Sequence, residues 1–316
     1  WSANPGGRNP WCLHWKNLSR IARQATLHCS RNLRLQETEF KVKSPEISVC
    51  IPVYNTEPFI AEAIESALNQ TFKDFELIIL DNRSTDNTLK IVRKFKDKRI
   101  RVVANKKKLG AEANWNAALD QASGKYIKIL CADDYIYPDC LEKQVEALRA
   151  ESSAVLVCAA RHIVDEKGKR IMKRGPRKSE TVPGIEAVRR AIRGGTNIYG
   201  ETSSALFRRD AQKKAGAFDA SIPYVIDLDM WTRLLLHGNL ILMDEAVSAY
   251  RVGAASWSAE IMTKQKENFM RFIERIEANP AFCLTGTDAI IGRFRATLQA
   301  ALRQLFYKFV LGWRKS

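Results

Sequence analysis

Two adjacent acids, Asp133 and Asp134, are the residues whose type and spacing first suggest chemistry. They come shortly after an apolar, β-favouring run, Tyr126 to Leu130, that begins beyond Gly124. This pattern predicts a buried strand that carries both carboxylates near its C-terminal end, where open α/β sheets bind their ligands. Adjacent carboxylates repel each other, so they need either water or a cation around them. A solvated acidic turn is the simpler interpretation, and the rest of the chain has to decide between the two.

The segments around this pair alternate between strand and helix. Apolar runs predict strands at 47–51, 75–80, 100–104 and 126–130, and amphipathic patterns predict helices at 56–68, 86–95, 110–122 and 138–150. Alternation at this spacing indicates βαβ units. We therefore expect an α/β fold with a mostly parallel central sheet.

After residue 150 the alternation becomes less regular. The pattern predicts strands at 154–159, 203–207 and 246–252, a hairpin at 163–171, a basic loop at 173–183 and a helix at 227–237. Gly238, just beyond that helix, is the residue type that most often ends one.

The C-terminal segment, 259–316, has the clearest helical periodicity of the chain and is expected to form amphipathic helices. One apolar stripe contains Leu298, Ala301, Leu302, Leu305, Phe306, Phe309, Val310 and Trp313. Basic residues, Arg295 and Arg303 among them, flank the stripe. Packing against the rest of the domain is one interpretation. Lying in a membrane interface is the other, and the two are compatible.

The excess of basic residues is concentrated at the two ends of the chain. Of a formal net charge of +16, residues 1–44 contribute eight Lys/Arg against two acids, and residues 259–316 contribute ten against five. This distribution suits contact with an anionic surface such as membrane phosphate. The seven cysteines include no CxxC pair, which favours reduced thiols in a cytoplasmic protein. No apolar run reaches the roughly 18 residues that a membrane-spanning helix needs.

Four stretches in register resemble the family 2 glycosyltransferases, which have the GT-A fold. They are ISVCIPVYN (47–55), FELIILDNRSTDNT (75–88), GKYIKILCADDYIYPDCL (124–141), and IDLDMWTRLLLHG (226–238) followed by YRV (250–252). The resemblance implies a Rossmann-like GT-A domain over 46–258, with a donor half at 46–150 and an acceptor half at 151–258. Residues 1–45 are then a basic N-terminal extension, expected to be poorly ordered.

The resemblance also implies which residues bind the nucleotide sugar and its metal. The expected nucleotide-sugar contacts are Pro52, Val53, Tyr54, Asn55, Glu57, Asp81, Asn82, Asn114 and Asp133. Asp133 and Asp134 match the last two acids of the family's D-x-D-D pattern, and Cys131 replaces the first. A thiol is a soft ligand that does not suit magnesium. We therefore assign Mg²⁺ or Mn²⁺ to Asp134, with Asp133 assisting through the metal or the ribose.

An acceptor hydroxyl must lose its proton as it attacks, so a base has to lie near it. By the same resemblance Asp227 takes the position of the catalytic base, and Ile226 replaces the acid that usually precedes it. Asp229 is interpreted as a charge that favours the N-terminal end of a helix. Gly253 stands where the family often has a histidine.

These observations predict an inverting glycosyltransferase that moves sugar from a nucleotide-diphosphate sugar to a saccharide or lipid-linked saccharide. The expected setting is bacterial cell-surface polysaccharide synthesis, in the cytoplasm or peripherally at the inner face of an anionic plasma membrane. A catalytically silent nucleotide-sugar-binding protein is the alternative that the substitutions at Cys131 and Ile226 favour. A basic nucleic-acid-binding protein is a second alternative, but no nucleic-acid module is recognisable and no such partner is expected.

Overall fold

In the computed structural model the chain divides into two units, residues 1–44 and Pro45–Ser316. The structure describes residues 44–253 and 264–309. All but the last two residues of the predicted N-terminal extension therefore lie outside the described part, and the account below concerns the second unit.

Four parallel strands form the first half of a mixed sheet. In space they follow the order β3 (Ile100–Ala104), β2 (Phe75–Asp81), β1 (Ile47–Val53) and β4 (Tyr126–Ile129). The helices α2 (Ile60–Leu68), α3 (Thr88–Val92), α4 (Ala111–Gln121) and α5 (Cys140–Ala150) alternate with these strands along the chain. The predicted α/β class is confirmed, and the carboxyl ends of the strands meet at one edge, as the alternation required.

The second half of the sheet is joined mainly by antiparallel pairs. β9 (Ala205–Arg208) pairs antiparallel with β4, and β6 (Ala154–Val164) pairs antiparallel with β9. β10 (Asn239–Arg251) runs parallel to β6. Three short strands, β5 (Tyr135–Ile136), β7 (Arg170–Arg174) and β8 (Glu180–Val182), add antiparallel pairs. The mostly parallel pairing that we expected therefore holds in the first half alone.

Two predicted boundaries in this half are wrong. β10 begins at Asn239 rather than at residue 246, and its pairing with β6 shifts register between Met243 and Ser248. The acids Asp244 and Glu245 interrupt the apolar run there, so the sequence pattern shows only the second part of the strand. The predicted loop at 173–183 contains β8, which pairs with β10.

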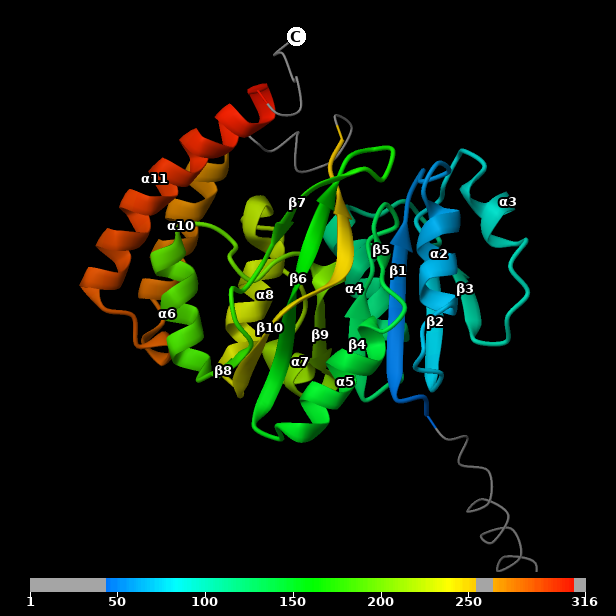
Figure 1. The fold of residues 1–316 in the computed structure, drawn as a ribbon, viewed down its shortest axis with the longest axis horizontal. Coiled ribbons are helices and arrows are strands. Elements are labelled where there is room, and N and C mark those ends of the chain that lie inside the picture. Colours follow the sequence, from blue (N-terminus) through cyan, green and yellow to red (C-terminus); the bar gives the residue numbers. More distant parts are fainter. Residues whose placement is uncertain (1–43, 254–263, 310–316) are drawn as a thin grey trace, which may run out of the picture. The chain divides into compact units, whose positions relative to one another are not determined.

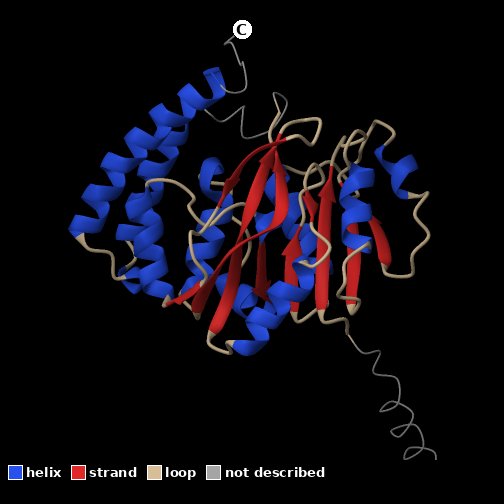
Figure 2. Cartoon of the chain, in the orientation of Figure 1, coloured by secondary structure: helices blue, strands red, loops and turns tan. Residues whose placement is uncertain are grey.

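Helices cover both faces of the sheet (Figures 1 and 2). Successive residues of β1 alternate between two cores: Val49 and Ile51 pack with α2 and α5, and Cys50 packs with the cluster on the other face. Buried residues of α4, α6 (Gly184–Gly194), α7 (Arg209–Ala215), α8 (Ile226–Leu235) and α10 (Gln265–Glu277) build that second cluster. Within the described residues, no helix combines the length and apolarity needed to cross a membrane.

The last helix, α11 (Gly286–Phe309), packs against α6 and α10 (Figure 1). Ala289 and Ala296 face inward and are buried. A Cβ at Gly292 would lie 2.7 Å from the Ile192 carbonyl oxygen, so this glycine permits the close approach of α11 to α6. The predicted stripe is helical through Phe309. The side chains of Phe306 and Phe309, and residues 310–316, lie outside the description.

Candidate active site

A cavity of about 850 Å³ opens at the carboxyl ends of the strands. The part of its wall from residues 46–150, the expected donor half, includes Pro52, Tyr54, Asn82, Asn114, Trp115 and Asp133. The part from residues 151–258, the expected acceptor half, includes Arg161, Asn197, Glu201, Tyr224 and Asp227, and α11 contributes Leu302 and Arg303. Residues far apart in sequence thus line one space. They come from the ends of β1 and β4, from α4, β6 and β7, and from α8 and α11.

Of the predicted nucleotide-sugar contacts, five line the cavity: Pro52, Tyr54, Asn82, Asn114 and Asp133. The structure holds several of them in place. The Asn82 amide oxygen accepts hydrogen bonds from the Leu109 backbone N–H (2.8 Å) and from Asn105 Nδ2 (3.0 Å). Asn105 also donates to the Asn114 amide oxygen (2.7 Å). Three asparagines thereby fix one polar wall of the cavity.

An aromatic and a cationic side chain lie beside this wall. Lys108 Nζ donates to Tyr54 Oη (2.7 Å) and lies 4.0 Å from the centroid of its ring. Trp115 lines the cavity on α4. Flat aromatic faces next to amide groups are suited to a heterocyclic base, which stacks on the ring and forms hydrogen bonds at its edge.

Four other predicted contacts do not line the cavity: Val53, Asn55, Glu57 and Asp81. Asp81 is 1% exposed, and its carboxylate oxygens accept from the backbone N–H groups of Arg83 and Ser84, both at 3.1 Å. Glu57 accepts from the backbone and side chain of Asn87 (3.0 and 2.9 Å). Both acids therefore stabilise the turn after β2, a role that competes with binding a nucleotide. The Ser, Thr and Asn residues beside them are typical of such a turn.

Asp133 and Asp134 face different surroundings. Asp133 lines the cavity, and apart from its own backbone amide no described residue donates a hydrogen bond to its carboxylate. Asp134 is 1% exposed, and its two oxygens accept from Ser203 Oγ (2.6 Å) and from the Arg251 backbone N–H (2.9 Å). Burial raises the pKa of both carboxyl groups, and the neighbouring Asp133 raises that of Asp134 further. Asp133 is thus the acid of the pair that lines the cavity. From the sequence we instead assigned the metal to Asp134, with Asp133 assisting.

These two acids and Cys131 form a group that a cation could bind. One candidate ligand atom from each lies within 4.8 Å of the others. Burial, reinforced by both acids, raises the pKa of the Cys131 thiol well above its ordinary value, so the thiol stays protonated. A protonated thiol is a poor metal ligand. The hard oxygen of Asp133, which lacks a donor from another residue, fits Mg²⁺ or Mn²⁺.

Asp227 lines the same cavity from the start of α8. Its Oδ1 accepts from the Leu228 backbone N–H (2.7 Å), and its Oδ2 accepts from Asn197 Nδ2 (2.8 Å). Burial first, and then the negative charge of Glu201, raise the pKa of Asp227 from 3.8 to about 7. A carboxylate with such a pKa can accept a proton near neutral pH.

The residue that orients Asp227 is itself fixed by a glycine turn. Asn197 Nδ2 also donates to the Gly200 carbonyl oxygen (3.0 Å), which accepts from Trp231 Nε1 as well (3.1 Å). Gly200 has a φ of +105°, and a Cβ there would lie 2.8 Å from Arg161 Nη1. Only glycine fits this position without strain.

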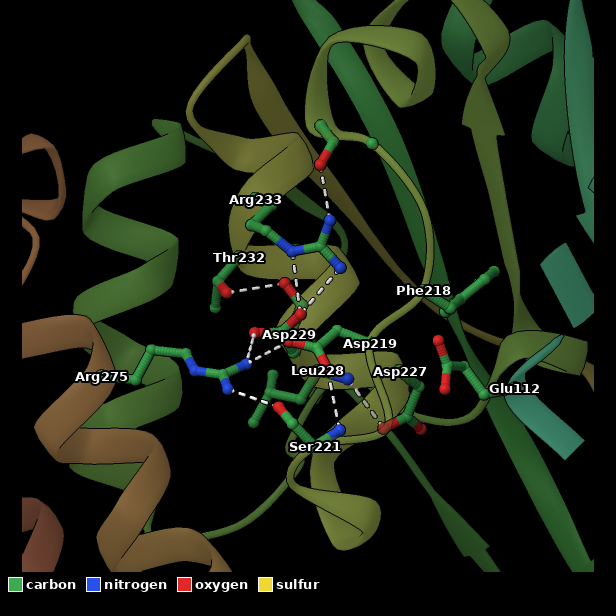
Figure 3. Close-up of polar contacts among 12 residues, drawn as sticks. Glu112, Phe218, Asp219, Ser221, Asp227, Leu228, Asp229, Thr232, Arg233 and Arg275 are labelled. Atoms are coloured by element: carbon green, nitrogen blue, oxygen red, sulfur yellow. Dashed lines mark hydrogen bonds and ion pairs between the residues drawn. The ribbon is translucent and has the colours of Figure 1, made fainter. Parts of the chain in front are cut away.

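Asp229 is occupied elsewhere, in a network that Figure 3 shows on the opposite side of α8 from Asp227. Its Oδ2 accepts from Arg233 Nε (2.8 Å), and its Oδ1 pairs with Arg275 Nη1 (3.2 Å) of α10. Arg275 also pairs with Asp219 (2.8 Å). Asp229 is buried, at 2% exposure. Its negative charge in the first turn of α8 is favourable there, as expected, and its ion pair with Arg275 also connects α10 to α8.

Several residues that line the cavity were absent from the sequence prediction. Arg161, Asn197, Glu201 and Arg303 belong to no recognised motif. They lie on β6, on the connection between α6 and η1 (Thr202–Ser204), and on α11, and tertiary packing brings them to the cavity. The alternation of Arg161 and Ile163 along β6 was a weak signal, because residues two apart share one face of a strand.

An α/β sheet with an acid after its fourth strand and a second carboxylate across one cavity is compatible with the GT-A fold. The family model described as Glycosyl transferase family 2 matches residues 48–216. The chain belongs to this family.

Three relatives illustrate the match. The UDP-Glc:alpha-D-GlcNAc-diphosphoundecaprenol beta-1,3-glucosyltransferase WfaP of Escherichia coli is 30% identical over 220 residues, covering 67% of this chain and 80% of WfaP. The crystal structure of S. aureus TarS 1-349 in complex with UDP-GlcNAc matches with a TM-score of 0.62 at 20% identity, over 84% of this chain and 73% of that one. The mannosyltransferase PcManGT from Pyrobaculum calidifontis, in complex with GDP-Man and Mn²⁺, matches with a TM-score of 0.59 at 18% identity, over 86% and 82%.

Proposed function

We propose that the protein is an inverting, metal-dependent glycosyltransferase that moves a hexosyl group from a nucleotide-diphosphate sugar to an acceptor hydroxyl. The observation that carries this proposal is the placement of Asp133 and Asp227 on one cavity, from different halves of the chain. Asp133 is suited to the donor side, and Asp227, with a pKa of about 7, is suited to the acceptor side.

In the proposed reaction Asp227 takes the proton of the acceptor hydroxyl. The acceptor oxygen then forms a bond to the anomeric carbon, while the bond from that carbon to the diphosphate oxygen breaks. The electron pair of the broken bond leaves on the nucleoside diphosphate. Attack from the face opposite the leaving group inverts the anomeric configuration. Asn197 keeps the carboxylate directed at the cavity, because its Nδ2 holds Oδ2.

The expected metal is Mg²⁺ or Mn²⁺, bound through Asp133. Asp134 supports that site indirectly, since both of its oxygens already accept hydrogen bonds from Ser203 and Arg251. When bound, such a cation supplies Lewis-acid neutralisation of the charge that develops on the diphosphate. The Mn²⁺ in the PcManGT complex lends support to this choice of ion.

The proposed setting is cell-surface polysaccharide synthesis at the cytoplasmic face of the membrane. WfaP, whose name specifies a diphosphoundecaprenol-linked acceptor, supports a lipid-linked substrate. The exposed apolar residues of α11 (Ile290, Phe294, Leu298, Leu302 and Leu305) support a peripheral contact with lipid, because they recur every three or four residues along one helix face.

Release of nucleoside diphosphate tests the proposal. Purified protein is incubated with Mn²⁺ and a panel of UDP- and GDP-sugars, with and without acceptor extracts. We expect metal-dependent release that Asp227→Asn abolishes without weakening donor binding. Binding of donors with no release under any acceptor condition would instead identify a silent nucleotide-sugar-binding protein.

A further inference from the structure

Two arginines stand opposite each other on the strand pair that forms one wall of the cavity. β6 and β7 pair antiparallel with Arg161 across from Arg174 and Ile163 across from Met172, and all four residues line the cavity. Like charges directly opposite in a sheet destabilise it. An ion pair with Glu201 (2.6 Å) relieves Arg161. The Arg174 side chain makes no ion pair or hydrogen bond with any described residue.

A third arginine reaches the same wall from α11. Arg303 Nη2 donates to Thr196 Oγ1 (2.5 Å), and its guanidinium lies 5.2 Å from the centroid of the Tyr224 ring. No carboxylate in the described part of the chain pairs with it. Burial lowers the pKa of Arg174, the charge of Arg161 lowers it further, the charge of Glu201 acts in the opposite direction, and that of Arg303 lowers it again. Two guanidinium groups that form no ion pair with a described acid therefore share one region of the cavity, and Glu201, the acid that acts on Arg174, is already paired with Arg161.

This region lies on the acceptor side. Burial raises the pKa of Tyr224, and the charges that act on the same phenol are those of Arg303, Asp227 and Arg174. Burial raises the pKa of Asp133, and the cation that opposes this rise is a different arginine, Arg251 at the end of β10. The two unpaired arginines are therefore neighbours of the proposed base rather than of the proposed metal site.

Unpaired guanidinium groups in a cavity favour an anion with several oxygens. Arginine presents planar forks of N–H donors that match phosphate, and such charged hydrogen bonds are about twice as strong as neutral ones. An anion here would also remove the repulsion between the guanidinium groups. A phosphate carried by the acceptor fits, because the position beside Asp227 is where the acceptor hydroxyl has to lie.

The exposed apolar face of α11 extends to the cavity beside these arginines. Its exposed residues begin with Ile290 (69% exposed) and Phe294 (73%) and continue to Leu302 (50%), which also lines the cavity next to Arg303. A molecule that occupied both surfaces would have an anionic head inside the cavity and an apolar chain outside it. That is the chemistry of a lipid phosphate.

We propose that Arg174 and Arg303 form a phosphate-binding subsite for the acceptor, and that this acceptor is a lipid-linked saccharide phosphate whose apolar chain follows α11. The inference rests on the proposed function, because it assigns the acceptor of that reaction. It adds a subsite and a recognition element on a helix beyond the matched family region, which ends at residue 216.

Binding of three probes to the full chain tests the inference. Geranyl diphosphate carries both charge and an apolar chain, inorganic pyrophosphate carries charge alone, and geraniol carries the chain alone. Calorimetric titrations are made in EDTA, so that a metal-dependent donor site does not contribute. The variants are Arg174→Gln, Arg303→Gln and their combination. The matched controls are Lys173→Gln, the neighbour of Arg174 on β7, and Arg295→Gln, an exposed arginine of α11 that does not line the cavity.

We expect the parent to bind geranyl diphosphate more tightly than either other probe. The double variant should bind it roughly tenfold to hundredfold more weakly, as the loss of charged hydrogen bonds predicts, while both controls match the parent. Affinity for UDP and GDP in the presence of Mn²⁺ should stay unchanged in every variant. If Arg303→Gln unfolds, Arg174→Gln carries the test, because the Arg174 side chain has no hydrogen bond or ion pair within the described residues to lose, and the substitution leaves the backbone pairing of β7 in place.

Three results would overturn the inference. Equal binding of geranyl diphosphate by parent and double variant would show that the arginines hold no phosphate. Equal affinity for pyrophosphate and geranyl diphosphate would make the source a free phosphate rather than a lipid. A parallel loss of UDP or GDP affinity would assign the arginines to the donor, and the proposed function would then stand while the acceptor subsite fell.

Discussion

Asp227 is a carboxylate whose surroundings oppose its ionised form. Burial and the charge of Glu201 raise its pKa, while the hydrogen bonds from Leu228 and Asn197 act in the other direction. Glu201 itself stays ionised: burial acts to raise its pKa, but the adjacent Arg161 holds it below its ordinary value. An ionised Glu201 next to Asp227 thus makes Asp227 a stronger base than an ordinary aspartate. General bases work best when their pKa lies near the operating pH.

The Asp227→Asn variant should therefore lose most of its transfer activity. The amide keeps size and one hydrogen-bond acceptor but cannot take a proton, so kcat should fall by about 10² to 10⁴. In the parent, kcat should rise with pH up to about 7, because the base must be deprotonated. Steady-state rates from pH 5 to 9 measure both effects. A parent profile that stays flat across that range would argue against Asp227 as the base.

The same residue should reduce stability at neutral pH. Its pKa rises on folding from 3.8 to about 7, so the folded protein holds that proton more firmly than the unfolded chain. Its favourable contribution is complete below pH 3.8 and is lost as the pH rises through about 7. Asp227→Asn should consequently melt above the parent at pH 8, with the difference shrinking toward pH 4. Melting temperatures across that range provide the measurement, and a constant difference would contradict it.

Substitutions of Asp133 and Asp134 should have different effects, the first on metal-dependent nucleotide binding and the second on stability. Asp133→Asn removes the cavity-facing carboxylate and should abolish the Mn²⁺ dependence of UDP or GDP binding without lowering the melting temperature. Asp134→Asn should instead destabilise the protein by about 1 to 3 kcal/mol, because its amide leaves Ser203 or the Arg251 N–H without an acceptor. Titrations and melting curves of both variants decide the matter. Loss of metal dependence in a fully stable Asp134→Asn variant would return the metal to that residue.

At the scale of elements, the sequence predicted segments with strong local patterns and missed those that depend on tertiary contacts. β1, β2 and β4 are buried on both faces and read as apolar runs. α6 escaped the prediction although Ala187, Val188, Ala191 and Ile192 form a regular buried face, since the two glycines and three arginines within it resemble a loop. The arginine pair of β6 and β7 follows from register alone, which no local pattern encodes.

The exposed face of α11 should act as a lipid contact. Replacing Phe294 and Leu298 by Ser removes two apolar side chains that are 73% and 49% exposed, so it should leave the melting temperature unchanged. Flotation with vesicles that contain phosphatidylglycerol should fall several-fold, because interfacial binding scales with buried apolar area. Thr297→Ala, on the same helix, is the matched control. Undiminished flotation of the double variant would mean that this face contacts something other than lipid.

At the scale of the whole molecule, the described core begins with the first strand. Ile47 is 0% exposed and pairs with both β2 and β4, and the family match begins at residue 48. Every residue to which the proposed reaction or the proposed acceptor subsite gives a role, from Asp133 to Arg303, belongs to the unit Pro45–Ser316. The sheet joins the proposed donor and acceptor halves through the pairing of β4 with β9, so both belong to one fold.

Removal of residues 1–44 should accordingly leave the catalytic unit intact. A chain that begins at Pro45 keeps Ile47 and all of β1, and it loses a segment with eight basic and two acidic residues. Its melting temperature, and its Mn²⁺-dependent affinity for UDP or GDP, should match those of the full chain. Binding to anionic vesicles, in contrast, should weaken in low salt, because each basic residue near such a surface contributes about 1 kcal/mol. A large drop in melting temperature or nucleotide affinity would show instead that residues 1–44 complete the fold.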